Sequence, residues 1–251
     1  GTGLVATPDE FGMSGELPTH PELLDHLASR LVADGWSLKR VIRRIVLSRT
    51  YRLSSNTLVN SAREADAANT LYWRANLRRL EWEPLRDSLL QVAGSLSTER
   101  PEGVQVSGIG GKTSKSKTGS LLDITDPYRT IYLPVLRAAV PESYSTFDFP
   151  DPCQISGRRD VTTVAPQALF FMNSRFVESC AQGAAQKWCV EIPREEPRID
   201  GAYRRIFGRS PTSDEIAETQ RLLADVAGSE VERWGVLVQA LVASAEFRYL
   251  R

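Results

Sequence analysis

The chain has 251 residues, of which 41% are hydrophobic and 25% are charged, an ordinary composition for a folded protein with a substantial core. Its 31 basic and 31 acidic residues give a formal net charge of zero. Nucleic-acid-binding domains usually carry a basic excess, so no nucleic acid partner is expected. No apolar run reaches the roughly 18 residues that a membrane-spanning helix needs, so no membrane span is expected in this chain.

Residues 1–18 are loop-like, and no basic segment leads into an apolar one, so no signal peptide is expected in this chain. The abrupt opening is typical of a piece cut from a longer protein. A first helix is predicted from Pro21, with Thr19 as its N-cap and Glu22 closing a capping box. We expect it to end at Gly35.

Ser37 is predicted to cap a second helix, whose apolar side chains recur with the helical period. These side chains are Leu38, Val41, Ile42, Ile45 and Val46. The opposite face carries four basic residues, Lys39, Arg40, Arg43 and Arg44. We interpret this basic face as solvated, with an acidic partner as the alternative.

Two further helices are predicted at residues 65–76 and 83–96. Between them, residues 78–87 alternate arginines, carboxylates and apolar side chains, which predicts ion pairs where two helices meet, with a ligand pocket as the alternative. Residues 97–120 are rich in glycine, serine and lysine and predict a flexible surface loop. A phosphate-binding loop is disfavoured there, because Val106 occupies the position that needs glycine.

Residues 129–135 are the best strand candidate, because they are rich in β-branched and aromatic side chains. Residues 121–124 are expected to pair with them as a short hairpin. A central loop follows at residues 147–163. Thr162 or Thr163 is predicted to cap the next helix, whose buried stripe would consist of Ala165, Leu169, Met172 and Phe176.

The end of the chain predicts three more helices. One covers residues 198–207, and Thr212 with Glu215 predicts a capping box at the start of the next. The apolar side chains of the final helix follow the helical period almost perfectly. They are Trp234, Leu237, Val238, Leu241, Val242 and Ala245.

These elements predict a mainly α fold, with a multi-helix domain, a small β-hairpin element and a helical C-terminal subdomain. Residues 1–190 would form the helical main domain, which contains the central loop 147–163 and the flexible loop 97–120. Residues 191–251 would form the C-terminal subdomain.

The metal-binding and redox residues are few. Cys153, Cys180 and Cys189 show no CxxC or CxxCH spacing, which excludes a c-type haem attachment or a cysteine-rich zinc site within this chain. Buried free thiols are favoured; a disulfide would require Cys189 beyond the end of its helix, or Cys153 close to one of the others. His20 and His26 are six apart and lie on different helix faces, so no metal site and no cofactor are expected.

The central loop is the strongest candidate for a ligand-binding site. It combines Asp148, Asp151 and Asp160 with the adjacent Arg158 and Arg159. Carboxylates bind hard cations or act as acid and base, and arginine forks hold sulfate, phosphate or carboxylate groups. Alternatively, the arginines pair with these acids and fold an otherwise irregular loop.

Aromatic side chains around the loop offer a second possibility. Tyr132 and Phe147, together with Tyr128, Tyr144 and Phe149, would line a groove for a carbohydrate or a partner domain. The competing interpretation places these rings in the hydrophobic core, where phenylalanine is usually found.

A set of ordered motifs supports a family resemblance. They are Thr19-His20-Pro21-Glu22-Leu23-Leu24-Asp25, Trp36-Ser37-Leu38-Lys39, Ser48-Arg49-Thr50-Tyr51-Arg52, Trp73-Arg74, Arg78-Arg79-Leu80-Glu81, Leu85-Arg86-Asp87, Phe147-Asp148-Phe149-Pro150-Asp151-Pro152, Gly157-Arg158-Arg159, Val161-Thr162-Thr163-Val164, Pro166-Gln167-Ala168-Leu169 and Asn173-Ser174. Together they resemble the uncharacterised C-terminal domain of multidomain planctomycete proteins that often carry a cytochrome-c-like module near the N-terminus. The resemblance implies an exported or periplasmic bacterial parent, whose other domains are partners of this one. It assigns no catalytic residues.

Two functions remain open. The first is a non-catalytic binding or scaffold domain that contacts a carbohydrate or a partner domain. The second is a hydrolase that acts on a polymeric or anionic substrate, for example a sulfated one, through the aspartates and arginines of the central loop. A serine, cysteine or zinc hydrolase is disfavoured, because the chain has no G-x-S-x-G motif and only two histidines, both on one helix.

Overall fold

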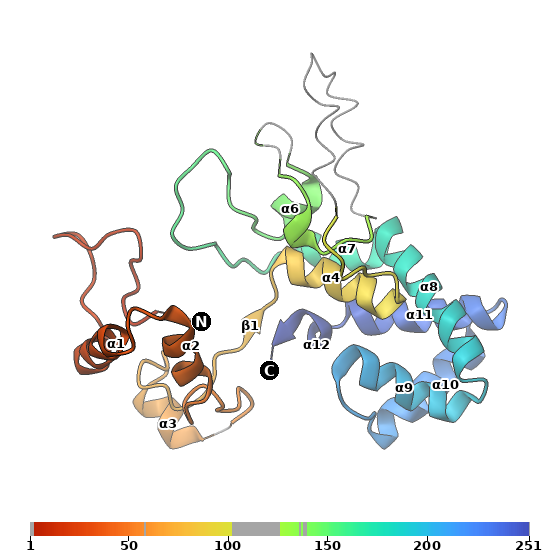
Figure 1. Cartoon of the computed structure of the whole chain (residues 1–251). Coiled ribbons are helices and arrows are strands. Elements are labelled where there is room, and N and C mark those ends of the chain that lie inside the picture. The colour runs from red at the N-terminus through yellow and green to blue at the C-terminus, as the bar shows by residue number, and fades with distance from the viewer. Residues whose placement is uncertain (1–2, 58, 102–125, 136, 138–139, 251) are drawn as a thin grey trace, which may run out of the picture. The chain divides into compact units, whose positions relative to one another are not determined.

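The structure is a computed structural model of the chain and describes residues 3–57, 59–101, 126–135, 137 and 140–250. It confirms the mainly α fold with a small two-stranded antiparallel sheet (Figure 1). The chain forms two compact units. The first comprises Gly1–Arg78, Ser156–Arg158 and Leu250–Arg251, and the second comprises Arg79–Ile155 and Arg159–Tyr249. The predicted loop 97–120 and the residues 121–124 lie largely outside the described residues.

In its described residues, the first unit contains three helices, none of which has a buried residue. They are α1 (Pro21–Ala33), α2 (Leu38–Val46) and α3 (Asn60–Ala65). The predicted capping box of α1 is wrong: His20 is the N-cap and provides no side-chain cap. The Thr19 hydroxyl instead donates a 3.3 Å hydrogen bond to the carbonyl of Leu4, which removes it from the helix end.

The helix predicted at residues 65–76 is also wrong, because α3 ends at Ala65. The Asp66 carboxylate accepts hydrogen bonds from the backbone amides of Thr70 (2.9 Å) and Leu71 (2.8 Å) and so competes with helical hydrogen bonds. These contacts, led by the bond from Leu71, lower the pKa of Asp66. Asn69 and Tyr72 then adopt left-handed backbone conformations, each with φ of 55°, which a continuous helix does not permit.

The other helices that the structure describes lie in the second unit. They are α4 (Trp82–Ala93), α6 (Glu142–Thr146), α7 (Ala165–Asn173), α8 (Arg175–Glu191), α9 (Glu195–Phe207), α10 (Ser213–Asp225), α11 (Glu230–Ala243) and α12 (Ala245–Arg248). Helices α8 and α11 share the most extensive interface between elements, and α4 packs on α8 (Figure 1).

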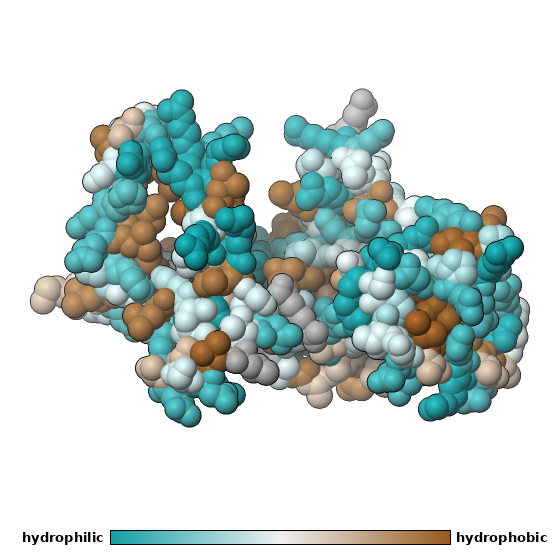
Figure 2. All heavy atoms as spheres, turned by 90° about the horizontal axis from the view of Figure 1, so that it is seen from below, coloured by the Kyte–Doolittle hydropathy of each residue, from teal (hydrophilic) through white to brown (hydrophobic). Residues whose placement is uncertain are grey.

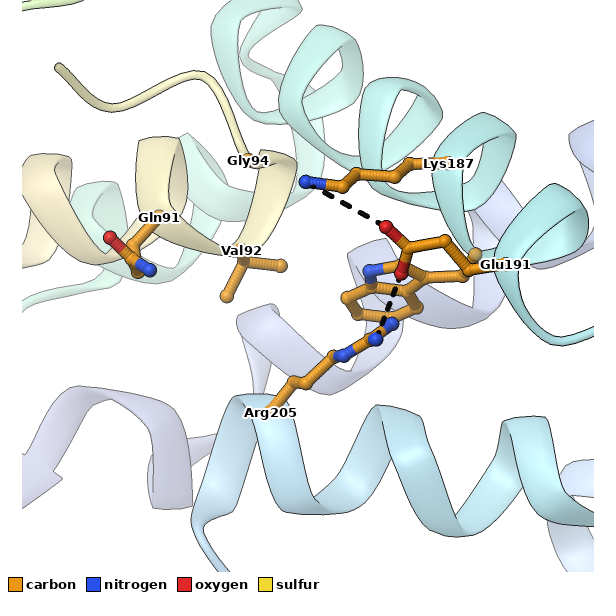
Figure 3. A pocket seen from close by; sticks show the side chains of 7 residues that line it. Gln91, Val92, Gly94, Lys187, Glu191 and Arg205 are labelled. Carbon is orange, nitrogen blue, oxygen red and sulfur yellow. Dashed lines mark hydrogen bonds and ion pairs between the residues drawn. The ribbon is translucent and has the colours of Figure 1, made fainter.

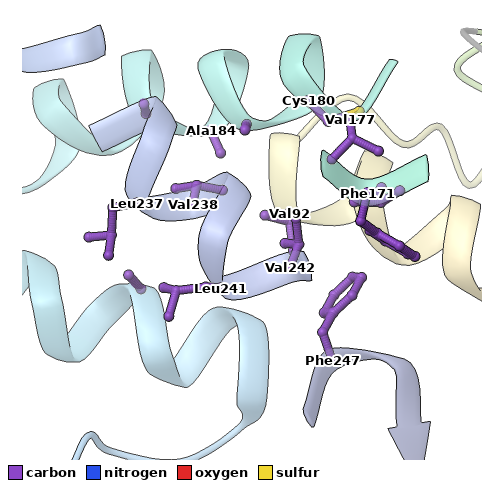
Figure 4. Packing of buried hydrophobic residues seen from close by; sticks show 14 of the residues in the cluster. Val92, Phe171, Val177, Cys180, Ala184, Leu237, Val238, Leu241, Val242 and Phe247 are labelled. Carbon is purple, nitrogen blue, oxygen red and sulfur yellow. The ribbon is translucent and has the colours of Figure 1, made fainter. Parts of the chain in front are cut away.

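One hydrophobic core lies between these helices. Val238 of α11 and Ala184 of α8 are fully buried, and the rings of Phe171 and Phe247 pack edge-on with their centres 6.2 Å apart (Figure 4). The apolar period predicted for the final helix is confirmed at its buried positions, Trp234, Leu237, Val238, Leu241 and Val242. The small side chains of α8 allow α11 to approach closely, and the apolar burial drives the packing.

The buried stripe predicted for this region is confirmed only at Phe176, which is 5% exposed and lies in α8, and it is wrong within α7. Gln167 and Phe171 are buried, whereas Leu169 and Met172 are 50% and 62% exposed. A polar residue occupies the core-facing position because its side chain has a specific hydrogen-bonding role in the central loop, described below. The apolar period alone therefore selected the wrong face of this short helix.

The strand predicted at residues 129–135 is wrong as well. Thr130–Tyr132 form the 3₁₀ helix η2, and the sheet is made by β1 (Arg78–Arg79) and β2 (Tyr249–Leu250). Side chains of α4 instead bind the backbone just before this segment and at its start. Arg86 donates to the carbonyls of Asp126 and Tyr128, and Asp87 accepts from the amide of Thr130 at 2.8 Å.

Arg86 itself is fully buried. Besides the two carbonyls, it donates to the Thr130 hydroxyl at 3.1 Å, and Asp87 lies 3.5 Å away as a counter-ion. Burial lowers the pKa of Arg86, because a charged group loses hydration there. The guanidinium therefore fastens the segment that contains η2 to α4.

The capping box predicted at Thr212 and Glu215 is confirmed at the start of α10. Glu215 also receives a bidentate pair of hydrogen bonds from Arg209, at 2.6 and 2.8 Å, and Arg209 binds Glu246 of α12 in the same way. The hydrogen bonds from Arg209 lower the pKa of Glu215 to about 2. This network joins the turn after α9 to α10 and α12.

We expect Arg86→Lys to destabilise the second unit by about 3 kcal/mol or more, since one ammonium group cannot bind three separated acceptors and would leave buried polar groups unpaired. Urea unfolding followed by circular dichroism measures the change. Arg129→Lys is the matched control, because Arg129 also faces Asp87 (3.8 Å) but is 51% exposed. Equal, small effects of both substitutions would contradict this assignment.

The stability that Glu215 confers should depend on pH. Because its pKa is lowered from 4.5 to about 2 in the folded state, its contribution is complete above pH 4.5 and disappears as the pH falls toward 2. Glu215→Gln should therefore lower the unfolding free energy by about 1 kcal/mol near neutral pH and progressively less in acid. Urea titrations at several pH values, with the exposed Glu218→Gln as control, test this; a pH-independent difference would count against it.

Candidate functional site

The centre of the loop 147–163 is the carboxylate of Asp148. Its Oδ2 accepts hydrogen bonds from Arg79 (2.6 Å) and from the backbone amide of Thr162 (2.8 Å), and its Oδ1 accepts from the Thr162 hydroxyl (2.8 Å). The side chains of Arg79 and Asp148 are only 3% and 12% exposed. Asp148 has a φ of 60°, a left-handed conformation that aspartate tolerates better than most residues. One side chain thus links both ends of the loop to β1.

Gln167 of α7 also contacts the residues around Asp148. Its side-chain amide donates to the carbonyl of Thr146 (3.0 Å) and to the hydroxyl of Thr162 (3.3 Å). The residue is 1% exposed. It holds the two loop ends together but offers no group to solvent. A single glutamine within an apolar helix is only a weak sequence signal for this role.

Arg159 forms the second ion-pair centre of the loop. It donates two hydrogen bonds of 2.8 Å to the two carboxylate oxygens of Glu83 and one of 2.9 Å to Glu81. Its guanidinium also lies 5.1 Å from the centre of the Phe149 ring. Burial, the largest single influence, acts to raise the pKa of Glu83, but the hydrogen bonds and charge of Arg159 together with a backbone hydrogen bond lower that pKa overall. Acids of residues 78–87 therefore form ion pairs as predicted, but with Arg159 of the central loop and not where two helices meet.

The other predicted polar residues do not converge on Asp148. The carboxylate of Asp151 accepts a 2.8 Å hydrogen bond from the amide of Cys153 and is exposed, as is Asp160. Arg158 is exposed and belongs to the first unit. Within the described part of the chain, no hydrogen bond joins the three aspartates to one another.

The aromatic candidates divide between core and surface. Phe147 is 2% exposed and stacks on Trp82, with ring centres 5.2 Å apart. Tyr144 is also buried and packs edge-on against Phe149 at 4.9 Å. Tyr132 lies half-buried in η2. Phe147 and Tyr144 therefore stabilise the loop from inside, and only partly exposed rings remain for a ligand.

A cavity of about 390 Å³ lies elsewhere in the second unit, between α4, α8 and α9. Lys187 and Arg205 extend toward it, and Glu191 lies between their charged groups (Figure 3). The carboxylate of Glu191 is 2.9 Å from Arg205 and 3.9 Å from Lys187. Glu191 offsets one of these two positive charges and engages both cations, which reduces the attraction of the cavity for an anionic ligand.

The thiols and acids show no further centre. The three cysteines are free, and burial raises the pKa of the Cys180 thiol to about 11, which makes it a poor nucleophile. Among the described residues, no group of three or more His, Cys, Asp or Glu side chains could hold a metal ion. No helix in the described part of the chain is long and apolar enough to cross a membrane.

The fold and the loop define a class: a mainly α-helical protein whose central loop, residues 147–163, is held by internal ion pairs. A family model matches residues 1–223, and the chain belongs to that family, PSD1, described as a protein of unknown function (DUF1553). No curated protein and no solved structure matches the chain.

The adjacent arginines of the loop provide a matched test of this geometry. Arg159→Ala should lower the unfolding free energy by about 1–3 kcal/mol, because it leaves two half-buried carboxylates without their partner. Arg158→Ala removes an exposed side chain and should change it by less than about 0.5 kcal/mol. Urea unfolding of both variants measures the difference. A larger effect at Arg158 would refute the assignment of Arg159 as the structural arginine.

Proposed function

We propose that this chain is a non-catalytic binding or scaffold domain of a larger exported bacterial protein, in which it contacts a carbohydrate or a partner domain. The observation that carries this proposal is the buried pair of Arg79 and Asp148. A catalytic carboxylate must reach its substrate, whereas Asp148 is surrounded by Arg79 and Thr162 and already accepts three hydrogen bonds. The central loop therefore supports an architectural role.

The second ion-pair centre supports the same conclusion. Arg159 directs both Nη atoms at Glu81 and Glu83, so its fork is not available to a sulfate or phosphate group. A ligand would have to displace two carboxylates that already match the guanidinium. Structural pairing is the more economical explanation for this arginine.

The hydrolase alternative has less support from the geometry. Asp151 and Asp160 are exposed, but neither is hydrogen-bonded to a second acid or to a base among the described residues. General acid–base catalysis relies on two groups that have different pKa values and face the same reacting bond. The described part of the loop brings no such pair together.

The family resemblance extends the proposal to the parent protein. It suggests a planctomycete multidomain protein, exported or periplasmic, that often includes a cytochrome-c-like module. The predicted boundary near residue 190 remains part of this proposal. In such a protein, a helical domain held by internal ion pairs would serve as a rigid support for its neighbours.

Ligand binding and turnover on one purified sample test the proposal. We expect no hydrolysis of sulfate-ester, phosphate-ester or glycoside substrates, and a rise in melting temperature with a neutral or sulfated oligosaccharide or with a partner domain. Asp148→Asn keeps the size and left-handed tolerance of the side chain but removes its charge. It should lower the melting temperature by several degrees through the unpaired Arg79.

Asp151→Asn is the control, because it changes an exposed carboxylate of the same loop and should leave the melting temperature nearly unchanged. Hydrolysis by the wild-type protein that Asp151→Asn abolishes, with its stability intact, would refute the non-catalytic proposal. It would make the loop a catalytic site.

A further inference from the structure

The first unit concentrates positive charge in one segment, although the chain as a whole is neutral. Residues 36–52 contain six basic side chains and no acidic one. The basic residues are Lys39, Arg40, Arg43, Arg44, Arg49 and Arg52. The segment comprises α2 and the residues on either side of it. Such segregation of charge creates a local positive potential that the net charge does not reveal.

Helix α2 places an apolar row directly beside this charge. Leu38, Ile42 and Val46 follow one another at four-residue intervals and are 67%, 57% and 37% exposed. Lys39 and Arg43 each follow a member of this row by one residue and are themselves exposed. In the described part of the chain, neither cation forms an ion pair. The row and its basic border are therefore both open to a partner.

The nearest acidic residue does not neutralise this border. Asp34, in the turn before α2, accepts two hydrogen bonds of 3.0 Å from Arg44, and its backbone carbonyl accepts one of 3.4 Å from Arg40. These contacts fix the turn between α1 and α2. They engage the other side of α2 and leave Lys39 and Arg43 unopposed.

Aromatic side chains lie at both ends of the segment. Trp36 is 71% exposed and adopts a left-handed conformation with φ of 62°; its backbone amide donates a 2.8 Å hydrogen bond to Leu31. Tyr51 is 62% exposed, and the Ser48 hydroxyl accepts its backbone amide at 3.1 Å. The backbone thus holds a tryptophan and a tyrosine in solvent. Figure 2 shows hydrophobic side chains at the surface of this unit among hydrophilic ones.

We propose that α2, with Trp36 and Tyr51, is an interfacial anchor that lies on the surface of an anionic lipid bilayer. The apolar row would enter the boundary between headgroups and acyl chains, while Lys39 and Arg43 remain at the level of the anionic headgroups. Tryptophan and tyrosine favour this boundary, because their rings are apolar and their N–H and O–H groups are polar.

A bilayer accounts for both properties of the segment. A nucleic acid or another soluble polyanion would satisfy the cations but leave Leu38 and Ile42 in water. A neutral apolar surface would bury the row but give the cations no counter-charge. Because α2 has only nine residues, its apolar row alone is too small for firm binding, and anionic lipid is required. The proposal concerns the first unit and does not depend on the proposed function.

Vesicle co-sedimentation of the purified chain tests the proposal. We expect binding to vesicles of phosphatidylcholine mixed with phosphatidylserine, little binding to phosphatidylcholine alone, and weaker binding as salt is added. Lys39→Glu/Arg43→Glu should weaken binding to the anionic vesicles at least about tenfold. Leu38→Ser/Ile42→Ser should also weaken it, because the apolar row contributes separately.

Two controls make the result specific. Arg175→Glu/Arg194→Glu produces the same change in net charge on exposed residues of the second unit and should leave binding unaltered. If circular dichroism shows that the charge-reversed variant does not fold, Lys39→Gln/Arg43→Gln takes its place, because it removes the two charges without reversing them. Absence of binding to anionic vesicles would overturn the proposal. So would binding that the serine variant retains fully, since a purely electrostatic partner would then suffice.

Discussion

The structure of the second unit depends on the hydrogen-bond acceptors that surround the buried guanidinium of Arg86. Arg86 has no contact with water, so its N–H groups must find acceptors within the protein, and it finds them in the segment before η2. Arg198 repeats this solution at the other end of the core. It is 1% exposed, donates to the carbonyls of Ile192 and Pro193, and lies 4.8 Å from the Trp234 ring. Each arginine fastens irregular backbone to a helix, which apolar packing alone would not do.

Arginines also stabilise the central loop, but there their hydrogen-bond acceptors are carboxylates in place of backbone carbonyls. Arg79 and Arg159 are each matched by acids that come from distant parts of the chain, and each lies over a phenylalanine ring. These two arginines and the rings beside them are thus engaged within the protein, whereas Asp151, Arg158 and Asp160 are exposed. In the first unit, the described helices have no buried residue and expose both apolar and basic side chains.

The elements that were predicted correctly are those whose stability depends on residues close together in the sequence. The capping box at Thr212 and the apolar period of α11 are properties of neighbouring residues, and both are confirmed. The strand predicted at residues 129–135 is wrong: Asp87 accepts the amide of Thr130, Arg86 binds the carbonyl of Tyr128 just before it, and both side chains lie more than 40 positions earlier. The candidate site shows the same limit. Asp148 and Arg159 were found from composition, but their partners lie 69 and 76 positions away, a pairing that no local pattern encodes.

That separation also bears on the order in which the protein assembles. Closing a loop of about 70 residues costs conformational entropy before any single ion pair can form, whereas helices such as α11 need only nearby residues. We therefore expect the contacts of Asp148 to form late in folding, after the helices of the core have packed together. A contact absent from the folding transition state governs the rate of unfolding rather than the rate of folding. The ion pair between Arg79 and Asp148 is then expected to slow unfolding, so that it sets the lifetime of the native state.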